Sequence, residues 1–208
     1  RAHQPEGQRR AMKAAWRAAG LSPAGVQRIE AHGTGTILGD KVETATLKEL
    51  LADEEFEKAG ATGLTAPPVV GSVKSNIGHL LSAAGAASMA KVILALEHKI
   101  LPPTAGFVNE AEGLNLAQEP ALRVLTKAEA WPAPAGGSPR LAVVNALGFG
   151  GFHAQVSLEE YIPDTRVKPE PASPTGGRKG ADQTLSRPPA RALAATRPAP
   201  ATQSRHFM

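Results

Sequence analysis

Two histidines stand at the ends of short apolar segments, where an imidazole can meet a ligand. His32 follows the segment VQRIEA and opens the sequence His-Gly-Thr-Gly-Thr. The adjacent glycines let a ligand chain lie against the backbone. The hydroxyls of Thr34 and Thr36 can hydrogen-bond an amide-bearing ligand. The same sequence also fits an ordinary polar turn with a structural histidine, so this first loop (residues 30–36) does not define a site by itself.

The second loop, residues 71–79, reads GSVKSNIGH and ends on His79. It also follows an apolar segment and precedes a helix, so backbone N–H groups point into the loop. Lys74 lies beside the predicted buried strand and needs an anionic neighbour there, which Asp40 or Glu43 can supply. Taken alone, Lys74 can equally be a solvated surface lysine.

The third loop, residues 145–151, reads NALGFGG. Three glycines around Phe149 favour a tight turn with exposed backbone N–H groups, which can donate to an oxyanion. An ordinary hairpin turn uses glycines in the same way and is the alternative.

The elements that position these loops alternate between helices and strands. Helices are predicted at residues 5–19, 40–51 and 82–98, and Asp40 and Glu43 suggest a capping box at the start of the second helix. Strands are predicted at residues 26–31, 69–73, 121–126, 141–147 and 153–161. This order predicts an α/β fold with a mixed sheet that ends in a hairpin.

Composition excludes several classes of site and protein. The 208 residues contain no cysteine, which excludes disulfides, thiolate metal sites and a cysteine nucleophile within this sequence. There is no apolar run of membrane-spanning length and no N-terminal signal pattern, although Arg1 suggests that the sequence begins inside a longer protein. We expect no metal site and no membrane association.

Charge separates the chain into two parts. Residues 162–208 hold 8 Lys or Arg against 3 Asp or Glu, whereas residues 1–161 are close to neutral. The last 47 residues are also rich in proline and poor in large apolar side chains. Such a composition predicts a disordered linker after a folded domain at residues 1–161. The alternative, a nucleic-acid-binding arm, would use its arginines, but they are widely spaced, and we expect no nucleic-acid partner.

Together and in this order, the three loops resemble the C-terminal half of a β-ketoacyl synthase, the condensing domain of polyketide and fatty-acid synthases. The matching motifs are EAHGTGT with GDxxE, then VGSVKSNIGH with AAG, then NxxGFGG with LEE. The resemblance covers residues 1–161. It implies the C-terminal half of a thiolase-like fold with α-β-α-β-α layers.

The resemblance also implies a reaction, the decarboxylative Claisen condensation of an acyl thioester with a malonyl-type extender. The chain would then be part of an acyltransferase, incomplete by itself, because the family's nucleophilic cysteine lies upstream in the missing N-terminal half. It implies a homodimer in the cytoplasm that works with an acyl carrier protein. No covalently bound cofactor is expected, and the carrier's phosphopantetheine serves as the substrate arm.

Residue roles follow from the same resemblance. His32 and His79 match the family's donors to the enolate oxygen, and Lys74 matches its lysine, supported by Asp40, Glu43 and Asn76. Thr34 and Thr36 match the threonines that contact the phosphopantetheine arm. Phe149 matches the gating phenylalanine, with Gly150 beside it in the oxyanion turn.

Three positions depart from the family pattern. Lys41 replaces a common proline, and Phe152 and His153 replace the threonine and asparagine of GFGGTNAH. The last two changes lie beside the oxyanion turn. They leave open a second hypothesis, a ketosynthase-like subunit that docks a carrier or has a structural role without condensing.

The composition of the tail yields a first prediction. Truncating the complete protein's ketosynthase domain at Asp164 should leave its melting temperature unchanged, because the tail lacks a core-forming pattern. The rate with a separately supplied carrier protein should also be nearly unchanged. Calorimetry of the truncated and full-length domains tests this, and a clear fall in melting temperature would show instead that the tail packs on the domain.

Overall fold

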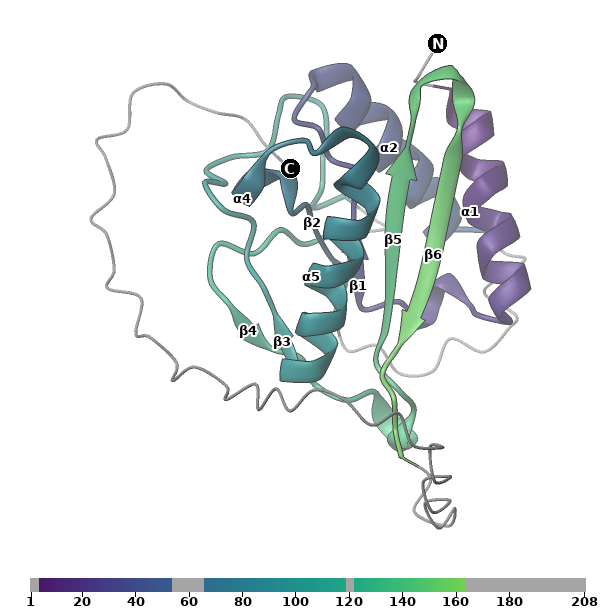
Figure 1. The fold of residues 1–208 in the computed structure, drawn as a ribbon, viewed down its shortest axis with the longest axis vertical. Helices are drawn as coiled ribbons and strands as arrows, with labels where there is room; N and C mark the ends of the chain where they lie inside the picture. The colour runs from purple at the N-terminus through teal and green to yellow at the C-terminus, as the bar shows by residue number, and fades with distance from the viewer. Residues whose placement is uncertain (1–3, 54–65, 119–121, 164–208) are drawn as a thin grey trace, which may run out of the picture. The chain divides into compact units, whose positions relative to one another are not determined.

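A four-stranded mixed sheet forms the centre of the computed structural model, which describes residues 4–53, 66–118 and 122–163 (Figure 1). The strand order is β2-β1-β5-β6. These strands are β1 (Arg28–Glu30), β2 (Val69–Gly71), β5 (Leu141–Leu147) and β6 (His153–Glu159). β1 pairs in parallel with both β2 and β5, and β6 runs antiparallel to β5. The predicted mixed α/β architecture is confirmed.

Helices cover both faces of this sheet (Figure 1). Helices α1 (Pro5–Ala19) and α2 (Ile37–Leu51) share one buried cluster with Val143 of β5. Helix α5 (Ala84–His98) shares the opposite cluster with Ala142 and Val144. Successive strand residues point to opposite faces, so this split within β5 places the sheet between two helical layers.

Helix α1 begins and ends where the sequence predicts. Pro5 occupies the first turn, where its missing N–H costs nothing, and Gly20 ends the helix at a left-handed φ of 64°. Met12 and Trp16 lie one turn apart and are both buried. The apolar stripe of α1 therefore faces the sheet as the spacing requires.

The predicted capping box at Asp40 is wrong. Helix α2 already begins at Ile37, with Thr36 at the N-cap position and no side-chain hydrogen bond to the cap. Asp40 lies one turn inside the helix, where its carboxylate accepts hydrogen bonds from the backbone N–H groups of Thr34 and Gly35. It therefore holds the preceding loop rather than the helix end.

The predicted strand at residues 121–126 is also wrong. Only one isolated bridge forms there, between Val69 and Arg123. The neighbouring backbone groups bond to other segments: Leu122 N–H to Leu116, and the carbonyl of Leu125 to Thr104 N–H. Only Arg123 pairs with β2, through hydrogen bonds to Pro68 and Val70, so no ladder develops. A short antiparallel pair that the sequence analysis did not predict, β3 (Ile100–Leu101) with β4 (Glu129–Ala130), lies nearby in the chain.

The remaining elements are short. They are the 3-10 turns η1 (Pro23–Gly25), η2 (Leu81–Ala83), η3 (Ala135–Gly137) and η4 (Phe149–Gly151), and the helix α4 (Lys74–Ile77). None of the helices in the described ranges is long and apolar enough to cross a membrane. The predicted linker lies, from residue 164 onward, outside the described residues.

A buried carboxylate joins three elements of the core. Glu30, at the end of β1, has no exposed surface. Its Oε2 lies 2.6 Å from the Arg28 guanidinium and 3.1 Å from Nζ of Lys91 on α5. Its other oxygen accepts the backbone N–H of Val73, just after β2. Burial lowers the pKa of Arg28 and of Lys91, and the charge of Glu30 opposes that shift in both.

Removing this charge should destabilise the fold strongly. We expect Glu30→Gln to lower the free energy of unfolding by about 3–5 kcal/mol, because it leaves buried cations without a counter-charge. Glu129→Gln is the matched control, since Glu129 pairs with Arg123 at 3.1 Å on the exposed surface and should contribute less than about 1 kcal/mol. Urea denaturation of the purified protein measures both, and equal effects would refute the structural role of Glu30.

Candidate active site

A cavity of about 670 Å³ brings the three loops together. Its lining includes His32, Thr34 and Thr36 from the first loop and His79 from the second. Ala146, Leu147, Gly148 and Phe152 line it in and just after the third loop. The three loops follow β1, β2 and β5, which are parallel, so their carboxyl ends lie at one edge of the sheet. The strand directions therefore explain why segments far apart in the sequence meet.

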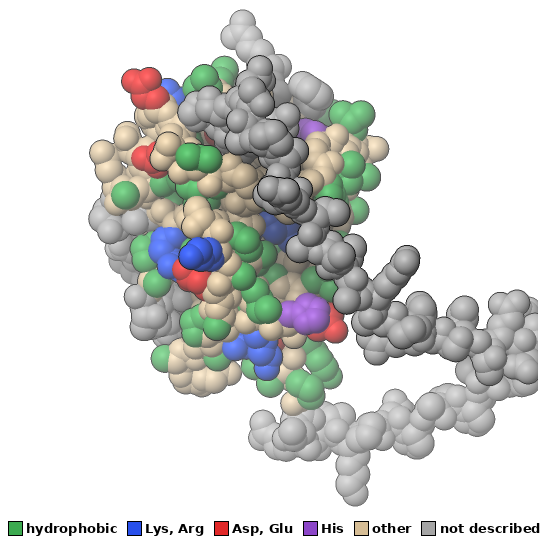
Figure 2. Space-filling view, turned by 90° about the vertical axis from the view of Figure 1, so that its left-hand side faces the viewer, with side chains coloured by type: hydrophobic (Ala, Val, Ile, Leu, Met, Phe, Trp, Pro, Cys, Tyr) green, Lys and Arg blue, Asp and Glu red, His purple; other side chains and the backbone are tan. Residues whose placement is uncertain are grey.

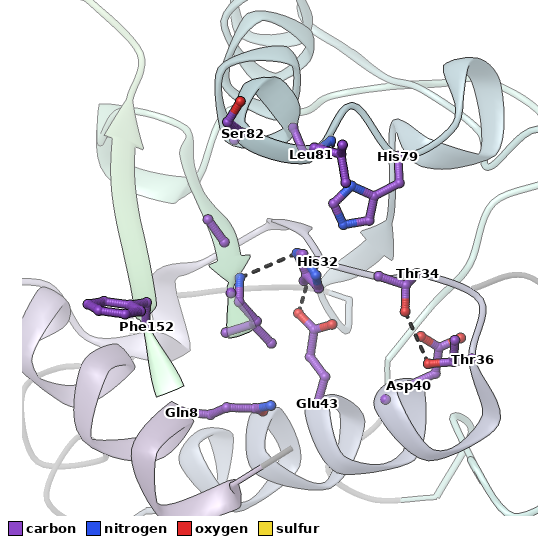
Figure 3. Close-up of a pocket in the computed structure, with 16 residues that line it drawn as sticks. Gln8, His32, Thr34, Thr36, Asp40, Glu43, His79, Leu81, Ser82 and Phe152 are labelled. Carbon is purple, nitrogen blue, oxygen red and sulfur yellow. Dashed lines mark hydrogen bonds between the residues drawn. The ribbon is translucent and has the colours of Figure 1, made fainter. Parts of the chain in front are cut away.

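The two histidines face each other across this cavity (Figure 3). Their ring centroids lie 5.4 Å apart, and the rings are nearly perpendicular at 80°. Nδ1 of His32 accepts the backbone N–H of Leu147 at 3.3 Å, and Nδ1 of His79 accepts that of Leu81 at 2.9 Å. A neutral imidazole that accepts at Nδ1 carries its proton on Nε2. Both rings are therefore set as N–H donors through Nε2.

The His79 acceptor bond depends on an unusual backbone conformation. Leu81 has a φ of +51°, which a leucine rarely adopts, and its N–H is the group that fixes Nδ1 of His79. Such strain persists only where the surrounding structure over-determines it, and it is concentrated at functional sites.

Glu43 holds the first loop from helix α2. It is fully buried, and its two oxygens accept the backbone N–H groups of His32 at 2.8 Å and Gly33 at 2.9 Å. One of them also accepts Nδ2 of Asn145 at 2.8 Å, and Oδ1 of Asn145 accepts Nε2 of Gln155 at 2.7 Å. Burial raises the pKa of Glu43, and these hydrogen bonds oppose the rise. A continuous network thus runs from β6 through β5 to the backbone of His32.

Glycine is required at residue 33. Its φ is +40°, and a Cβ built there would lie 2.9 Å from Cβ of Ser72. The first and second loops therefore touch through backbone and small side chains, and any larger residue would push them apart.

The threonines and Asp40 lie on one side of His32 in Figure 3. The hydroxyls of Thr34 and Thr36 are 3.1 Å apart, and both side chains line the cavity. Asp40 lines it as well and is almost fully buried. Burial and the charge of Glu43 raise its pKa to about 6, against the hydrogen bonds from Gly35 and Thr34.

Lys74 lies close to the acidic residues but does not line this cavity. It is buried, and burial lowers its pKa against the charges of Glu43, Glu30 and Asp40. Among the described residues no ion pair within 4.0 Å joins it to them, so these charges act on it over a longer range. Glu30 was absent from the acidic partners that the sequence analysis proposed for Lys74.

Asn76 is not brought to the histidines. It is exposed and lines a second cavity, of about 520 Å³, between α4 and α5. The third loop does form a tight turn: Gly148 N–H bonds to the carbonyl of Phe152 at 2.6 Å, and Gly150 has a φ of +74°. Phe149 lies in η4 of this turn, as predicted from the glycines.

Sequence reasoning assigned no role to three neutral amides. Asn145, which entered the sequence analysis only as part of the NxxGFGG motif, and Gln155 belong to the Glu43 network, whereas Gln8 lines the cavity without a partner among the described residues. At Gln8 and Asn145 the signal is burial of a polar side chain, which only the packed structure reveals. In the described ranges, no group of three His, Cys, Asp or Glu side chains is arranged to hold a metal ion. What the site offers chemically is two imidazole N–H donors in one cavity, beside buried carboxylates.

The raised pKa of Asp40 gives a pH-dependent prediction. An acid whose pKa is about 6 when folded and about 3.8 when unfolded stabilises the fold below pH 4, and that contribution is lost as the pH rises to 6. Asp40→Asn, which does not titrate, should therefore gain stability relative to the native protein across this interval, by about 3 kcal/mol.

Melting temperatures of both proteins between pH 4 and pH 8 test this prediction. Glu49→Gln, an exposed change on the same helix, is the control and should show no such trend. A constant difference between Asp40→Asn and the native protein would contradict the assigned pKa.

Comparisons with known proteins agree with this geometry. Residues 1–108 match the family described as "Beta-ketoacyl synthase, C-terminal domain". The chain is 42% identical over 161 residues to polyketide synthase ThaG from Burkholderia thailandensis, covering 75% of the chain and 3% of that protein. It is 40% identical over 161 residues to a polyunsaturated fatty acid synthase from Thraustochytrium sp., covering 76% of the chain and 6% of the matched polypeptide.

The fold is likewise similar to solved structures. The ketosynthase from module 6 of the bacillaene synthase of Bacillus subtilis 168 has a TM-score of 0.67 at 34% identity, covering 77% of this chain and 27% of that one. The sequence therefore spans a small part of its curated relatives and about a quarter of a ketosynthase chain. The family match, the relatives and the similar fold together show that the chain belongs to the β-ketoacyl synthase family, in which it corresponds to the C-terminal domain of the thiolase-like fold.

Proposed function

We propose that this chain supplies the decarboxylation half of a condensing site that acts in polyketide or fatty-acid synthesis. The observation that carries the proposal is the pairing of His32 and His79 in one cavity, each with Nδ1 occupied by a backbone N–H. The proposed reaction is the decarboxylative Claisen condensation of an acyl thioester with a malonyl-type thioester, which makes the complete protein an acyltransferase.

Decarboxylation of the malonyl-type thioester is accelerated by hydrogen-bond donors at the thioester oxygen. When the malonyl-type group loses carbon dioxide, the electron pair of the broken C–C bond moves into the thioester, and negative charge develops on the thioester oxygen. Two Nε2–H groups directed to that oxygen stabilise charge that is absent from the ground state, and this lowers the barrier. The enolate then attacks the acyl carbon, and the acyl group's thiolate leaves.

The other residues take supporting roles in this proposal. Lys74 and the surrounding carboxylates set the electrostatic potential and hold the loops. Thr34 and Thr36 bind the phosphopantetheine arm of an acyl carrier protein, which their position on the cavity wall supports. Backbone N–H groups of the third loop, at Phe149 and Gly150, contribute to the oxyanion site of acyl transfer.

The proposal requires partners that supply what this sequence lacks. A cysteine nucleophile must come from an N-terminal ketosynthase half, since these residues contain none. Large apolar side chains remain exposed on α5 and near the cavity, among them Ile93, Leu94 and Leu81. Figure 2, seen from the side of α4, shows further apolar side chains exposed between charged groups of both signs. Such surface supports burial against a second half-domain, and we propose a homodimer in the cytoplasm as the assembled form.

A second candidate function is a ketosynthase-like subunit that does not condense. Phe152, in place of the family's threonine, is 81% exposed and lines the cavity beside the third loop. His153, in place of the asparagine, lies against Gly7 of α1. The discriminating observation is whether the complete protein carries the nucleophilic cysteine.

The histidine roles predict a separation of two half-reactions. In the complete ketosynthase, His32→Ala or His79→Ala should slow decarboxylation of the malonyl-type thioester by about 100- to 1000-fold, as loss of one oxyanion donor does elsewhere. Acyl loading on the cysteine should continue, because the donors serve the enolate. Release of carbon dioxide and mass-spectrometric detection of the acyl-enzyme measure the two steps.

His98→Ala is the matched control, because His98 lies at the end of α5 and lines only the second cavity. It should leave both steps intact. A variant of His32 or His79 that loses loading and keeps decarboxylation would overturn the assignment.

A further inference from the structure

The amide of Gln8 is buried without a partner on the wall of the cavity. Gln8 projects from α1 and has no exposed surface. Among the described residues, neither Oε1 nor Nε2 has a hydrogen-bond partner. Its backbone is satisfied, since its N–H bonds to the carbonyl of Gln4 at 3.1 Å. The unpaired groups are therefore those of the side chain alone, and burying an amide without a hydrogen-bond partner destabilises the fold.

Gln8 shares its cavity with both histidines. Figure 3 draws Gln8 and Phe152 on one side of His32, and Thr34, Thr36 and Asp40 on the other. During acyl loading, an arm bound along the threonines would carry its acyl chain past the histidines toward Gln8. Apart from the polar residues already named and Ser82, the lining of the cavity is apolar or small, comprising Gly39, Leu81, Ala84, Gly85, Ala146, Leu147, Gly148 and Phe152.

We propose that Gln8 is a specificity-determining residue that recognises a hydroxyl group on the acyl chain, an inference that rests on the proposed function. A hydroxyl is the smallest group that accepts from Nε2 and donates to Oε1 at once, so it satisfies both unpaired atoms. A keto oxygen satisfies Nε2 only, and an alkyl chain satisfies neither. When a substrate analogue leaves a buried polar group of the site without a hydrogen-bond partner, the site discriminates strongly against that analogue.

The position of Gln8 also limits what can reach it. Gln8 has no exposed surface, so a hydroxyl, which is as large as a water molecule, can hydrogen-bond to it only if a neighbouring side chain of the cavity wall moves aside. The rival explanation is purely structural. Gly7 lies so close to His153 that a Cβ would be 2.9 Å from its Cδ2, and both His153 nitrogens are buried without a described partner, so the Gln8 amide could serve the α1–β6 contact instead.

The test compares three acyl chains of equal length, β-hydroxybutanoyl, β-oxobutanoyl and butanoyl, in the complete ketosynthase and its Gln8→Met variant. Methionine keeps the length of the side chain and removes both hydrogen-bonding groups. In the native protein we expect kcat/KM to fall in the order hydroxy, oxo, alkyl. In Gln8→Met, the ratio of hydroxy to alkyl should fall by about tenfold or more.

Ser88→Ala is the matched control. Ser88 is also fully buried with an unpartnered hydroxyl among the described residues, but it lies on α5 and does not line this cavity. It removes the same kind of unpaired group and should leave the substrate ratio unchanged. If Gln8→Met alters the free energy of unfolding while the ratio stays at its native value, the structural explanation holds and the inference is wrong.

Dissociation constants for stable amide analogues of the same three acyl-pantetheines separate this inference from the proposed function. A native preference for the hydroxy analogue that Gln8→Met abolishes supports the inference even if no condensation occurs, in which case only the proposed function fails. If the complete protein condenses but Gln8→Met leaves the ratios of the dissociation constants unaltered, the role of Gln8 is overturned. The proposed function then still stands.

Discussion

Parallel pairing of β1 with β2 and β5 is the constraint on which the rest of the site depends. Parallel strands end at the same edge, so the loops after Glu30, Gly71 and Leu147 open onto one cavity. The antiparallel return of β6 then closes the third loop into a tight turn. If β1 or β2 ran the other way, His32 and His79 could not face each other, whatever their spacing in the sequence.

Two buried carboxylates keep that arrangement rigid. Glu30 ties β1 to α5 and to the start of the second loop, and Glu43 ties α2 to the first loop and, through Asn145, to β5. Both accept backbone N–H groups of the loops that surround the cavity, so these loops are fixed by charge-assisted hydrogen bonds rather than by packing alone. Their proximity also explains why Lys74 can be buried, because burial of an ammonium group requires negative charge nearby.

The cavity combines fully satisfied and unsatisfied polar groups. The histidines have backbone donors at Nδ1, and Glu43 has three partners, whereas the amide of Gln8 has none among the described residues. A fully satisfied group holds a loop in place, and an unsatisfied one is available to a ligand. This contrast within one cavity assigns positioning to Glu43 and recognition to Gln8.

The sequence alone determined the order of the main elements and the motifs. Met12 and Trp16 indicated the buried stripe of α1, the mostly apolar run LAVVNAL predicted β5 with its observed bounds, and the glycine-rich loops indicated the family. Local rules failed where tertiary contacts decide. Asp40 is of a residue type that favours helix N-caps, but its carboxylate accepts hydrogen bonds from the loop that precedes the helix. Residues 122–125 form their backbone hydrogen bonds with several different segments. Gln8, Gln155 and Glu30 acquire their roles only when distant elements pack together, because a polar side chain's partners depend on three-dimensional proximity, which local sequence patterns do not encode.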